Sequence, residues 1–451
     1  MSNVYTPGVT LLRRIEIVRY RDHSNGLPVL ASPPMLRRFF LLVIAVTGLA
    51  CGGDQTPPVV NPCPSDSPPP AMTPPPLRSD FTGVFDVLTQ SFYIFGGDPG
   101  QPLSCAPSGG AASGEFWRYT IACKYWSQLN PMTMPPARTG AASAHEGFPA
   151  NRNRMIMFGG RGASGLLNDV WAFDFATQTW SQLMIMGTAM PSPREHATIV
   201  YNSIYDQMIV FGGNAGPDPA QPMLLNDIWM LDMTMDKNAW TQLPAMGTGA
   251  QQPQPRIGHV SVYDDTPQVL YVGFGQNAGG TYLRDMWAYF YDTSMMPPTG
   301  KWTLHPISDG PSARIGAGMA NTGSGRIVLF GGRDQDLGPL NDIWNFSTGS
   351  SAKPWMIEVA GDTKLMDGGS ACMRPSNFVT PVLTSPERRS GMLFAFGYPG
   401  FPYVVAGQGD CGDLIDVWTL LEGTGWLQLD KSTDDVSCAR AMKTGCTSLC
   451  Q

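Results

Sequence analysis

Charged side chains are scarce in this sequence. Asp, Glu, Lys and Arg make up 14% of its 451 residues, and the formal net charge is −7. A nucleic-acid-binding domain is expected to carry a strongly basic face, so this balance argues against that class of function. Histidine is rarer still, with five residues, which leaves few imidazoles for a metal or acid–base centre.

Motifs of common catalytic centres are also missing. The sequence has no P-loop, no Gly-x-Ser-x-Gly turn, no His-Glu-x-x-His pair and no dinucleotide-binding fingerprint. We therefore predict that the chain is not an enzyme, with no catalytic residue, no cofactor and no metal ion.

Glycine and proline, by contrast, are abundant, with 51 and 41 residues. This composition favours turn-rich β structure over long helices. Short apolar runs such as FYIF at 92–95 and MIVF at 208–211 are rich in β-branched and aromatic residues, so they predict buried strands.

Segment 35–51, MLRRFFLLVIAVTGLAC, has two arginines, an apolar run and small residues before a cysteine. These are marks of an export signal, and the apolar run is too short to span a bilayer comfortably. The ending GLAC resembles a bacterial lipobox, which implies that Cys51 is lipidated and begins the mature protein. Gly48 stands where that pattern usually has Leu, and an ordinary signal peptide with a chance cysteine is the alternative.

The flanking segments fit an exported lipoprotein. Residues 1–34 precede Met35, the expected translation start, and are interpreted as an extension that is not translated. Residues 52–77 are rich in proline and predict a disordered, semi-rigid tether. No Asp follows Cys51 directly, which resembles sorting to the outer membrane. We expect localisation at the outer membrane or cell surface, with the lipid as the membrane contact.

The tryptophans reveal an internal repeat. Each of six units has an Arg near its start, an apolar run ending at or near glycine, an acidic-x-Trp motif and a second Trp. The twelve tryptophans pair as Trp117/Trp126, Trp171/Trp180, Trp229/Trp240, Trp287/Trp302, Trp344/Trp355 and Trp418/Trp426.

The order, spacing and number of these residues resemble the kelch motif over residues 78–429. The resemblance implies an all-β, six-bladed β-propeller of the galactose oxidase/kelch type, with four antiparallel strands per blade. The tail 430–451 is rich in cysteine and either adds a strand that closes the ring or caps the last blade. The expected blades are 78–129, 138–183, 194–243, 256–305, 314–359 and 388–429.

Stacking of blades explains why the tryptophans recur, because a single blade leaves the faces of its sheet uncovered. A Trp ring covers a large area, and we expect its N–H to find an acceptor. The glycines supply backbone freedom where the chain turns close to its neighbour.

Binding is expected on the rim that carries the loops between strands 2 and 3 and between strands 4 and 1. Insertions at 98–114 and 360–388 lengthen loops there, and loops on a rigid scaffold are common binding sites. A ligand over the channel mouth would meet the residues just after the glycine turns. These are Asp98, Arg161, Asn214, Asn277, Arg333 and Asp410.

Eight cysteines remain besides Cys51, and an even number in an exported protein predicts disulfides. We expect one bond to be Cys372–Cys411, because both residues lie in loops on the same rim around the sixth blade. A zinc site is the alternative for the cluster Cys438, Cys446 and Cys450.

Other metal sites are weaker interpretations. Galactose oxidase relatives imply copper held by two His and two Tyr, but no Tyr–His pair is found here. Met-x-Met pairs such as Met155/Met157 suit Cu(I), although gap filling explains them as well. Acidic positions such as Asp334/Asp336 and Asp410/Asp413 suit Ca²⁺ but are more often turn residues.

The function predicted is non-catalytic binding or scaffolding in the bacterial cell envelope. The rim loops would hold an envelope or extracellular protein, or a glycan. The alternatives are a carbohydrate-active enzyme on a kelch propeller, similar to a mutarotase or oxidase, and a purely structural envelope protein.

Overall fold

The computed structural model describes residues 74–99, 111–147, 152–234, 237–244, 252–292, 299–305, 307–323, 325–350, 353–361, 384–397, 400–409 and 412–431. Strands and turns dominate these residues, and none of them lies in an α-helix. Accordingly, no helix in this part of the chain is long and apolar enough to cross a membrane. The prediction of an all-β fold is confirmed for these residues.

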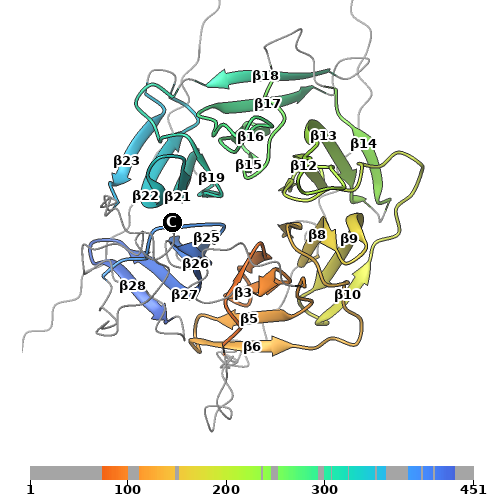
Figure 1. The fold of residues 1–451 in the computed structure, drawn as a ribbon, viewed down its shortest axis with the longest axis horizontal. Coiled ribbons are helices and arrows are strands. Elements are labelled where there is room, and N and C mark those ends of the chain that lie inside the picture. The colour runs from red at the N-terminus through yellow and green to blue at the C-terminus, as the bar shows by residue number, and fades with distance from the viewer. Residues whose placement is uncertain are drawn as a thin grey trace, which may run out of the picture. The chain divides into compact units, whose positions relative to one another are not determined.

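Four-stranded antiparallel sheets form from strands that follow one another in the chain (Figure 1). The first sheet contains β2 (Thr82–Asp86), β3 (Ser91–Phe95), β5 (Phe116–Thr120) and β6 (Tyr125–Leu129). The second contains β7 (Ala142–Glu146), β8 (Arg154–Gly162), β9 (Gly165–Asp174) and β10 (Thr179–Gln182). The third contains β11 (Thr198–Asn202), β12 (Gln207–Asn214), β13 (Leu224–Asp232) and β14 (Ala239–Gln242). The fourth contains β15 (Val260–Asp264), β16 (Val269–Gly273), β17 (Met286–Asp292) and β18 (Thr299–His305).

The last two repeat units are joined in a ten-stranded sheet. Within it, the fifth unit pairs β20 (Gly318–Asn321), β21 (Arg326–Asp334), β22 (Gly338–Ser347) and β23 (Trp355–Val359) in order. The sixth pairs β25 (Leu393–Gly397), β26 (Phe401–Gly409), β27 (Gly412–Leu421) and β28 (Gly425–Asp430). The short strands β19 (Arg314–Ile315) and β24 (Arg389–Ser390) belong to this sheet, and β1 (Arg78–Ser79) pairs with β4 (Asp98–Pro99) in the first unit.

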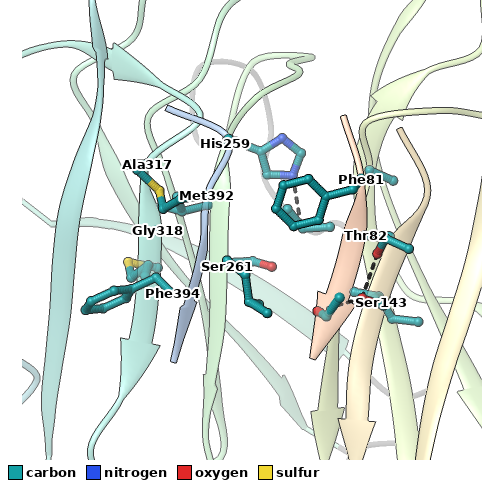
Figure 2. Close-up of a pocket in the computed structure, with 18 residues that line it drawn as sticks. Phe81, Thr82, Ser143, His259, Ser261, Ala317, Gly318, Met392 and Phe394 are labelled. Carbon is teal, nitrogen blue, oxygen red and sulfur yellow. Dashed lines mark hydrogen bonds between the residues drawn. The ribbon is translucent and has the colours of Figure 1, made fainter. Parts of the chain in front are cut away.

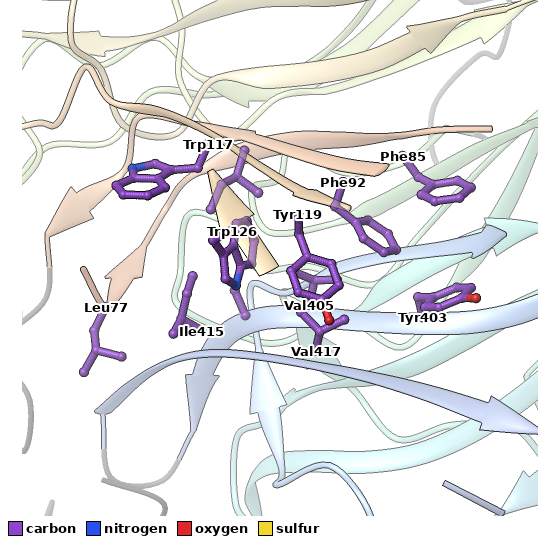
Figure 3. Packing of buried hydrophobic residues seen from close by; sticks show 12 residues of the cluster. Leu77, Phe85, Phe92, Trp117, Tyr119, Trp126, Tyr403, Val405, Ile415 and Val417 are labelled. Carbon is purple, nitrogen blue, oxygen red and sulfur yellow. The ribbon is translucent and has the colours of Figure 1, made fainter. Parts of the chain in front are cut away.

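Apolar clusters join each unit to the next. Five buried clusters each combine side chains from two consecutive units. A sixth cluster combines Tyr119 and Trp126 of the first unit with Tyr403 and Val417 of the last (Figure 3). The first strands also contact one another in a cyclic order, β2, β7, β11, β15, β20, β25 and again β2.

Each unit is held internally by a buried arginine near its start. In the second unit, Arg138 donates to both carboxylate oxygens of Asp169 at 2.7 and 2.9 Å and to the Gly159 carbonyl at 2.9 Å. Trp171 donates its indole N–H to the same carboxylate at 2.7 Å. The acidic-x-Trp motif therefore couples strand 3 to the start of the unit. The arginines, all at most 1% exposed, are Arg78, Arg138, Arg194, Arg256, Arg314 and Arg389.

The two positions of the glycine turn have different backbone requirements. The second position has φ between 90° and 109° in all six units and is always glycine, a conformation in which a side chain is strained. The first position is left-handed with a smaller φ, which non-glycine residues adopt more readily. Phe274 (φ 58°) and Ala406 (φ 57°) occupy it in the fourth and sixth units.

In the second to sixth units, the second tryptophan packs against an aromatic ring of the preceding unit. Trp240 meets Phe158 with ring centroids 5.3 Å apart, and Trp302 meets Phe211 at 5.4 Å. The expectation that each indole N–H finds an acceptor is wrong for five of the second tryptophans, because they pack over apolar clusters. Within the described residues, the buried Nε1 atoms without a hydrogen bond are those of Trp126, Trp180, Trp240, Trp302 and Trp355.

Candidate functional site

A cavity of about 250 Å³ lies among the first strands of all six units (Figure 2). Its wall combines apolar side chains such as Phe81 and Phe394 with the hydroxyls of Thr82, Ser143 and Ser261. The hydroxyls of Thr82 and Ser143 are 2.6 Å apart and hydrogen-bonded. The wall therefore has few charged groups and offers mainly hydroxyls as polar contacts.

His259 is the imidazole in this wall, and its environment is structural. Its side chain is buried, and Nε2 lies 2.9 Å from the Thr198 hydroxyl. Burial, together with repulsion from Arg256, lowers the pKa of His259 to about 3. The ring is thus neutral at physiological pH and packs edge-on against Phe211, as expected of a packed wall residue.

Six equivalent residues, each two positions after a buried arginine, belong to this wall or lie within two residues of it along the chain. We call these the mouth residues. They have left-handed φ between 50° and 65°. Backbone hydrogen bonds join neighbouring members: Gly140 N–H donates to the Asp80 carbonyl at 2.9 Å, and His196 N–H donates to the Gly140 carbonyl at 2.8 Å. The mouth residues are Asp80, Gly140, His196, Gly258, Gly316 and Gly391.

Asp80 and His196 are the two mouth residues with side chains, and these meet over Gly140. Nε2 of His196 lies 3.6 Å from Oδ2 of Asp80, and a Cβ on Gly140 would lie 2.9 Å from that nitrogen. The His196 side chain is 34% exposed and the Asp80 side chain 55% exposed, so both are open to a ligand.

The charges of this pair reinforce each other. Burial opposes ionisation of His196, but hydrogen bonding and attraction to Asp80 outweigh it and raise the pKa of His196. Burial likewise opposes ionisation of Asp80, yet His196 lowers the pKa of Asp80 below its usual value. Each member of the pair thus favours the charged form of the other, and an imidazole donor stands beside a carboxylate acceptor at the mouth.

Two of the predicted binding residues adjoin this pair. Arg161 binds Glu195 through two hydrogen bonds of 2.7 and 2.8 Å, and Asn214 donates to Glu195 at 3.2 Å. Glu195 directly precedes His196. Its negative charge also raises the pKa of His196, by less than Asp80 does. Arg161, Asn214, Glu195, His196 and Asp80 therefore form one continuous polar arc across the first three units.

The other predicted binding residues do not belong to this arc. Asp98 pairs in register with Ser79, beside Asp80. Arg333 pairs in register with Ile315 and is exposed. Asn277 accepts the N–H groups of Gly279 and Thr281, which fixes a turn. Asp410 lies outside the described residues.

Strand register shows which residues truly correspond after the glycine turn. In the fourth unit the paired residue is Gln276, one position before Asn277, since the turn there is Phe274–Gly275. In the sixth unit it is Gln408, which pairs with Ser390. The sequence analysis did not predict Asp80, His196 or Glu195 as binding residues. The available signal for Asp80 and His196 was their position two residues after the repeat arginine, which is glycine in the other four units.

Metal sites find no support in the described part of the chain. No group of three or more His, Cys, Asp or Glu there could hold a metal ion. Asp334 accepts the N–H groups of Asp336 and Leu337 and is a turn residue. Cys123 is disulfide-bonded. The expected Cys372–Cys411 bond, the alternative zinc cluster and Cys51 lie outside the described residues.

Comparison with known proteins gives a family match and several relatives. Residues 64–252 and 204–420 match the KLHDC2/KLHL20/DRC7 Kelch-repeats domain. The chain is 31% identical over 244 residues to Putative adagio-like protein 2 of Oryza sativa subsp. japonica, covering 51% of this chain and 36% of that protein. Identity to Adagio protein 3 of Arabidopsis thaliana is 29% over 264 residues, or 56% and 39% of the two chains. Identity to the Dynein alpha chain, flagellar outer arm, of Chlamydomonas reinhardtii is 24% over 277 residues, which cover 57% of this chain and 6% of that protein. The chain thus spans less than two fifths of the length of each of these relatives.

Proposed function

This chain belongs to the kelch-repeat family, and from that premise we propose that it is a non-catalytic scaffold that binds a protein partner at the mouth of a closed, six-bladed propeller. Closure is supported by the sixth apolar cluster, which joins the last unit to the first, and by the cyclic contacts of the first strands. Each of the six units supplies one blade.

The observation that carries the binding site is the placement of Asp80 and His196. Left-handed backbone costs a non-glycine residue about 1 kcal/mol or more, and such strain gathers at functional sites. Four of the six mouth residues are glycine, yet these two keep side chains at φ 50° and 54°. The two side chains meet each other and remain exposed, as a binding role requires.

The chemistry of the arc suits a polar protein surface. Imidazole and guanidinium N–H groups stand beside carboxylates and the Asn214 amide, so donors and acceptors alternate over a short distance. A backbone or side-chain amide of a partner fits such a surface because it offers one donor and one acceptor. Arg161 is already bound by Glu195, so this arc is not a simple anion site.

Converting both side chains to the glycine of the other units tests the site. In the double variant Asp80→Gly/His196→Gly, we expect the free energy of unfolding to stay within about 1 kcal/mol of the wild-type value. Glycine relieves the left-handed backbone strain, and this gain offsets the loss of the interaction between the two side chains. Partner affinity should fall at least about tenfold, since the central polar contacts are gone. The measurement is capture of partners from envelope extract by the immobilised full chain, followed by titration of the captured protein.

Arg326→Ala supplies the matched control. Arg326 is exposed and binds Glu358 of β23. It begins β21, at the end opposite to Asp334, which pairs in register with the buried Arg314 near the mouth residues. This variant should bind the captured partner as the wild type does. Equal binding by the double glycine variant would remove the mouth as the site, and failure of the wild type to capture any saturable partner would remove the scaffold function.

We further propose that the propeller is displayed on the bacterial cell surface by a lipid on Cys51 and the proline-rich tether 52–77. The support is the signal-like segment 35–51 and the disulfide at Cys123, which suits an oxidising compartment. Mass spectrometry of the chain purified from its membranes should find Cys51 as a diacylated N-terminus. A peptide from upstream of Met35, or an unmodified Cys51, would contradict this assignment.

A further inference from the structure

The last unit meets the first without a shared strand among the residues that the structure describes. The strands β25–β28 and β2–β6 are each supplied by one unit, so no strand exchange links them. Among these residues, their contact consists of the sixth apolar cluster, of β2 against β25, and of β1, which lies against β26 and β27. We call this contact the seam. Within each unit, backbone hydrogen bonds between strands hold the sheet together. Among the described residues, side-chain packing holds the last unit against the first.

Asp413 lies at the inner end of the seam. It is 4% exposed and sits near the start of β27, where it faces Asp98 and Asp80 of the first unit. Ser79 and Gln408 hydrogen-bond its carboxyl group, whereas Oδ1 has no hydrogen-bond partner in the described part of the chain. Burial, and then repulsion from the two facing carboxylates, raises the pKa of Asp413 to about 7.

Asp430 lies at the outer end of the seam, as the last residue of β28. Burial raises the pKa of Asp430 to about 6, opposed in part by the Lys431 backbone N–H and the Trp126 indole, while Asp416 adds repulsion. Asp416 is itself bound by Arg389 at 2.5 and 2.9 Å. The facing groups of the first unit are the Trp126 indole and the Tyr119 hydroxyl.

These two carboxyls share a feature found at no other acidic group for which the described residues show a pKa shift. Every other such carboxyl is shifted down, by an arginine, a histidine or hydrogen-bond donors. Both exceptions lie on the last unit and face the first. We propose that the seam is a pH-dependent latch, closed while Asp413 and Asp430 are protonated and loosened once both ionise.

The direction follows from linkage. The usual pKa of an aspartate is about 3.9 in an unfolded chain, so a raised pKa means that the closed seam binds protons more tightly than the open one. Stability of the seam is therefore fully present at low pH and falls as pH rises through the range up to about 6 for Asp430 and 7 for Asp413. Opening admits water and counter-ions to both carboxylates, which relieves their repulsion.

The latch rests on the proposed closed ring, and it extends the binding proposal. Asp80 is both a mouth residue and one of the carboxylates that face Asp413. Opening the seam would separate Asp80 from Asp413 and change the surroundings of the mouth, so partner affinity should differ between mildly acidic and alkaline pH.

Hydrogen exchange of the full chain at pH 6 and pH 8, corrected for the intrinsic exchange rates, tests the latch. We expect protection in β5, β6, β27 and β28 to fall at least about tenfold at the higher pH, because each ionising group shifts the opening equilibrium by up to about tenfold per pH unit. Protection in β12 and β13 should change less than about twofold. The variant Asp413→Asn/Asp430→Asn keeps both groups neutral and should retain protection at both pH values.

The controls separate the latch from the ring. Asp232→Asn removes a carboxyl on β13 that has a lowered pKa, so it should leave the seam response unchanged. The single Asn variants replace the double one if that chain does not fold, and each should remove part of the response. Equal protection of the seam strands at both pH values, or an unchanged response in the Asn variants, would overturn the latch. Absence of protection in these strands at either pH would show instead that the ring is open.

Discussion

Replacing Asp342 by alanine is expected to lower the free energy of unfolding by about 3–5 kcal/mol. Asp342 is 8% exposed and accepts hydrogen bonds from both terminal nitrogens of Arg314 at 2.7 and 2.9 Å. Its removal leaves a buried guanidinium without a counter-charge, and Trp344 loses the acceptor of its indole N–H. Urea denaturation of the full chain, followed by fluorescence and circular dichroism, measures the change.

Glu358→Ala in the same unit is the matched control. Glu358 binds Arg326 at 2.8 Å, but these side chains are 36% and 46% exposed. Solvent screens an exposed pair, so we expect this variant to cost less than about 1 kcal/mol. If both variants lower the free energy of unfolding equally, the buried ion pair of Arg314 and Asp342 stabilises the chain no more than an exposed one. The structural role assigned to the acidic-x-Trp motif would then be wrong.

Trp240→Ala is expected to destabilise the chain by about 3–5 kcal/mol. The ring is 4% exposed and lies in the cluster that joins the second and third units, where it packs on Phe158. Alanine leaves a cavity at that contact, because strands on both sides are held by their own ladders and cannot close over it. Thermal and urea unfolding should both report the loss.

Phenylalanine separates packing from hydrogen bonding at the same site. The Trp240 N–H has no acceptor among the described residues, so Trp240→Phe loses area alone and should cost less than about 2 kcal/mol. Trp171→Phe also removes a hydrogen bond to Asp169 and should cost more. A larger loss for Trp240→Phe than for Trp171→Phe would contradict the two roles assigned to the paired tryptophans.

Much of the fold could be predicted because its signals are local. Apolar runs before the glycine turns mark the second strands, and the paired tryptophans mark the third and fourth. The arginine–carboxylate bonds were harder to see, since their partners lie between 27 and 37 residues apart along the chain and the first unit uses Glu115. The recurrence of both residue types in every unit was the available signal.

The candidate site was less predictable because it depends on contacts between units. Arg161 and Asn214 were found by counting from the glycine turn, and strand register agrees with that count. In the fourth unit the count failed at Asn277, since Phe274 replaces the first glycine of the turn. Asp80 and His196 stand 116 positions apart, and nothing local indicates that their side chains meet.

The buried arginine and its carboxylate always belong to the same unit, whereas the second tryptophan packs on the unit before it. A gene duplication that copies one unit therefore carries its internal bonds along intact and exposes just one new surface, already shaped to fit its own copy. Such a module can multiply within a chain without the invention of new contacts. The junction between the two ends departs from this pattern, because Trp126 of the first unit shares a cluster with Val405 of the last, whereas the five other second tryptophans each pack on a phenylalanine.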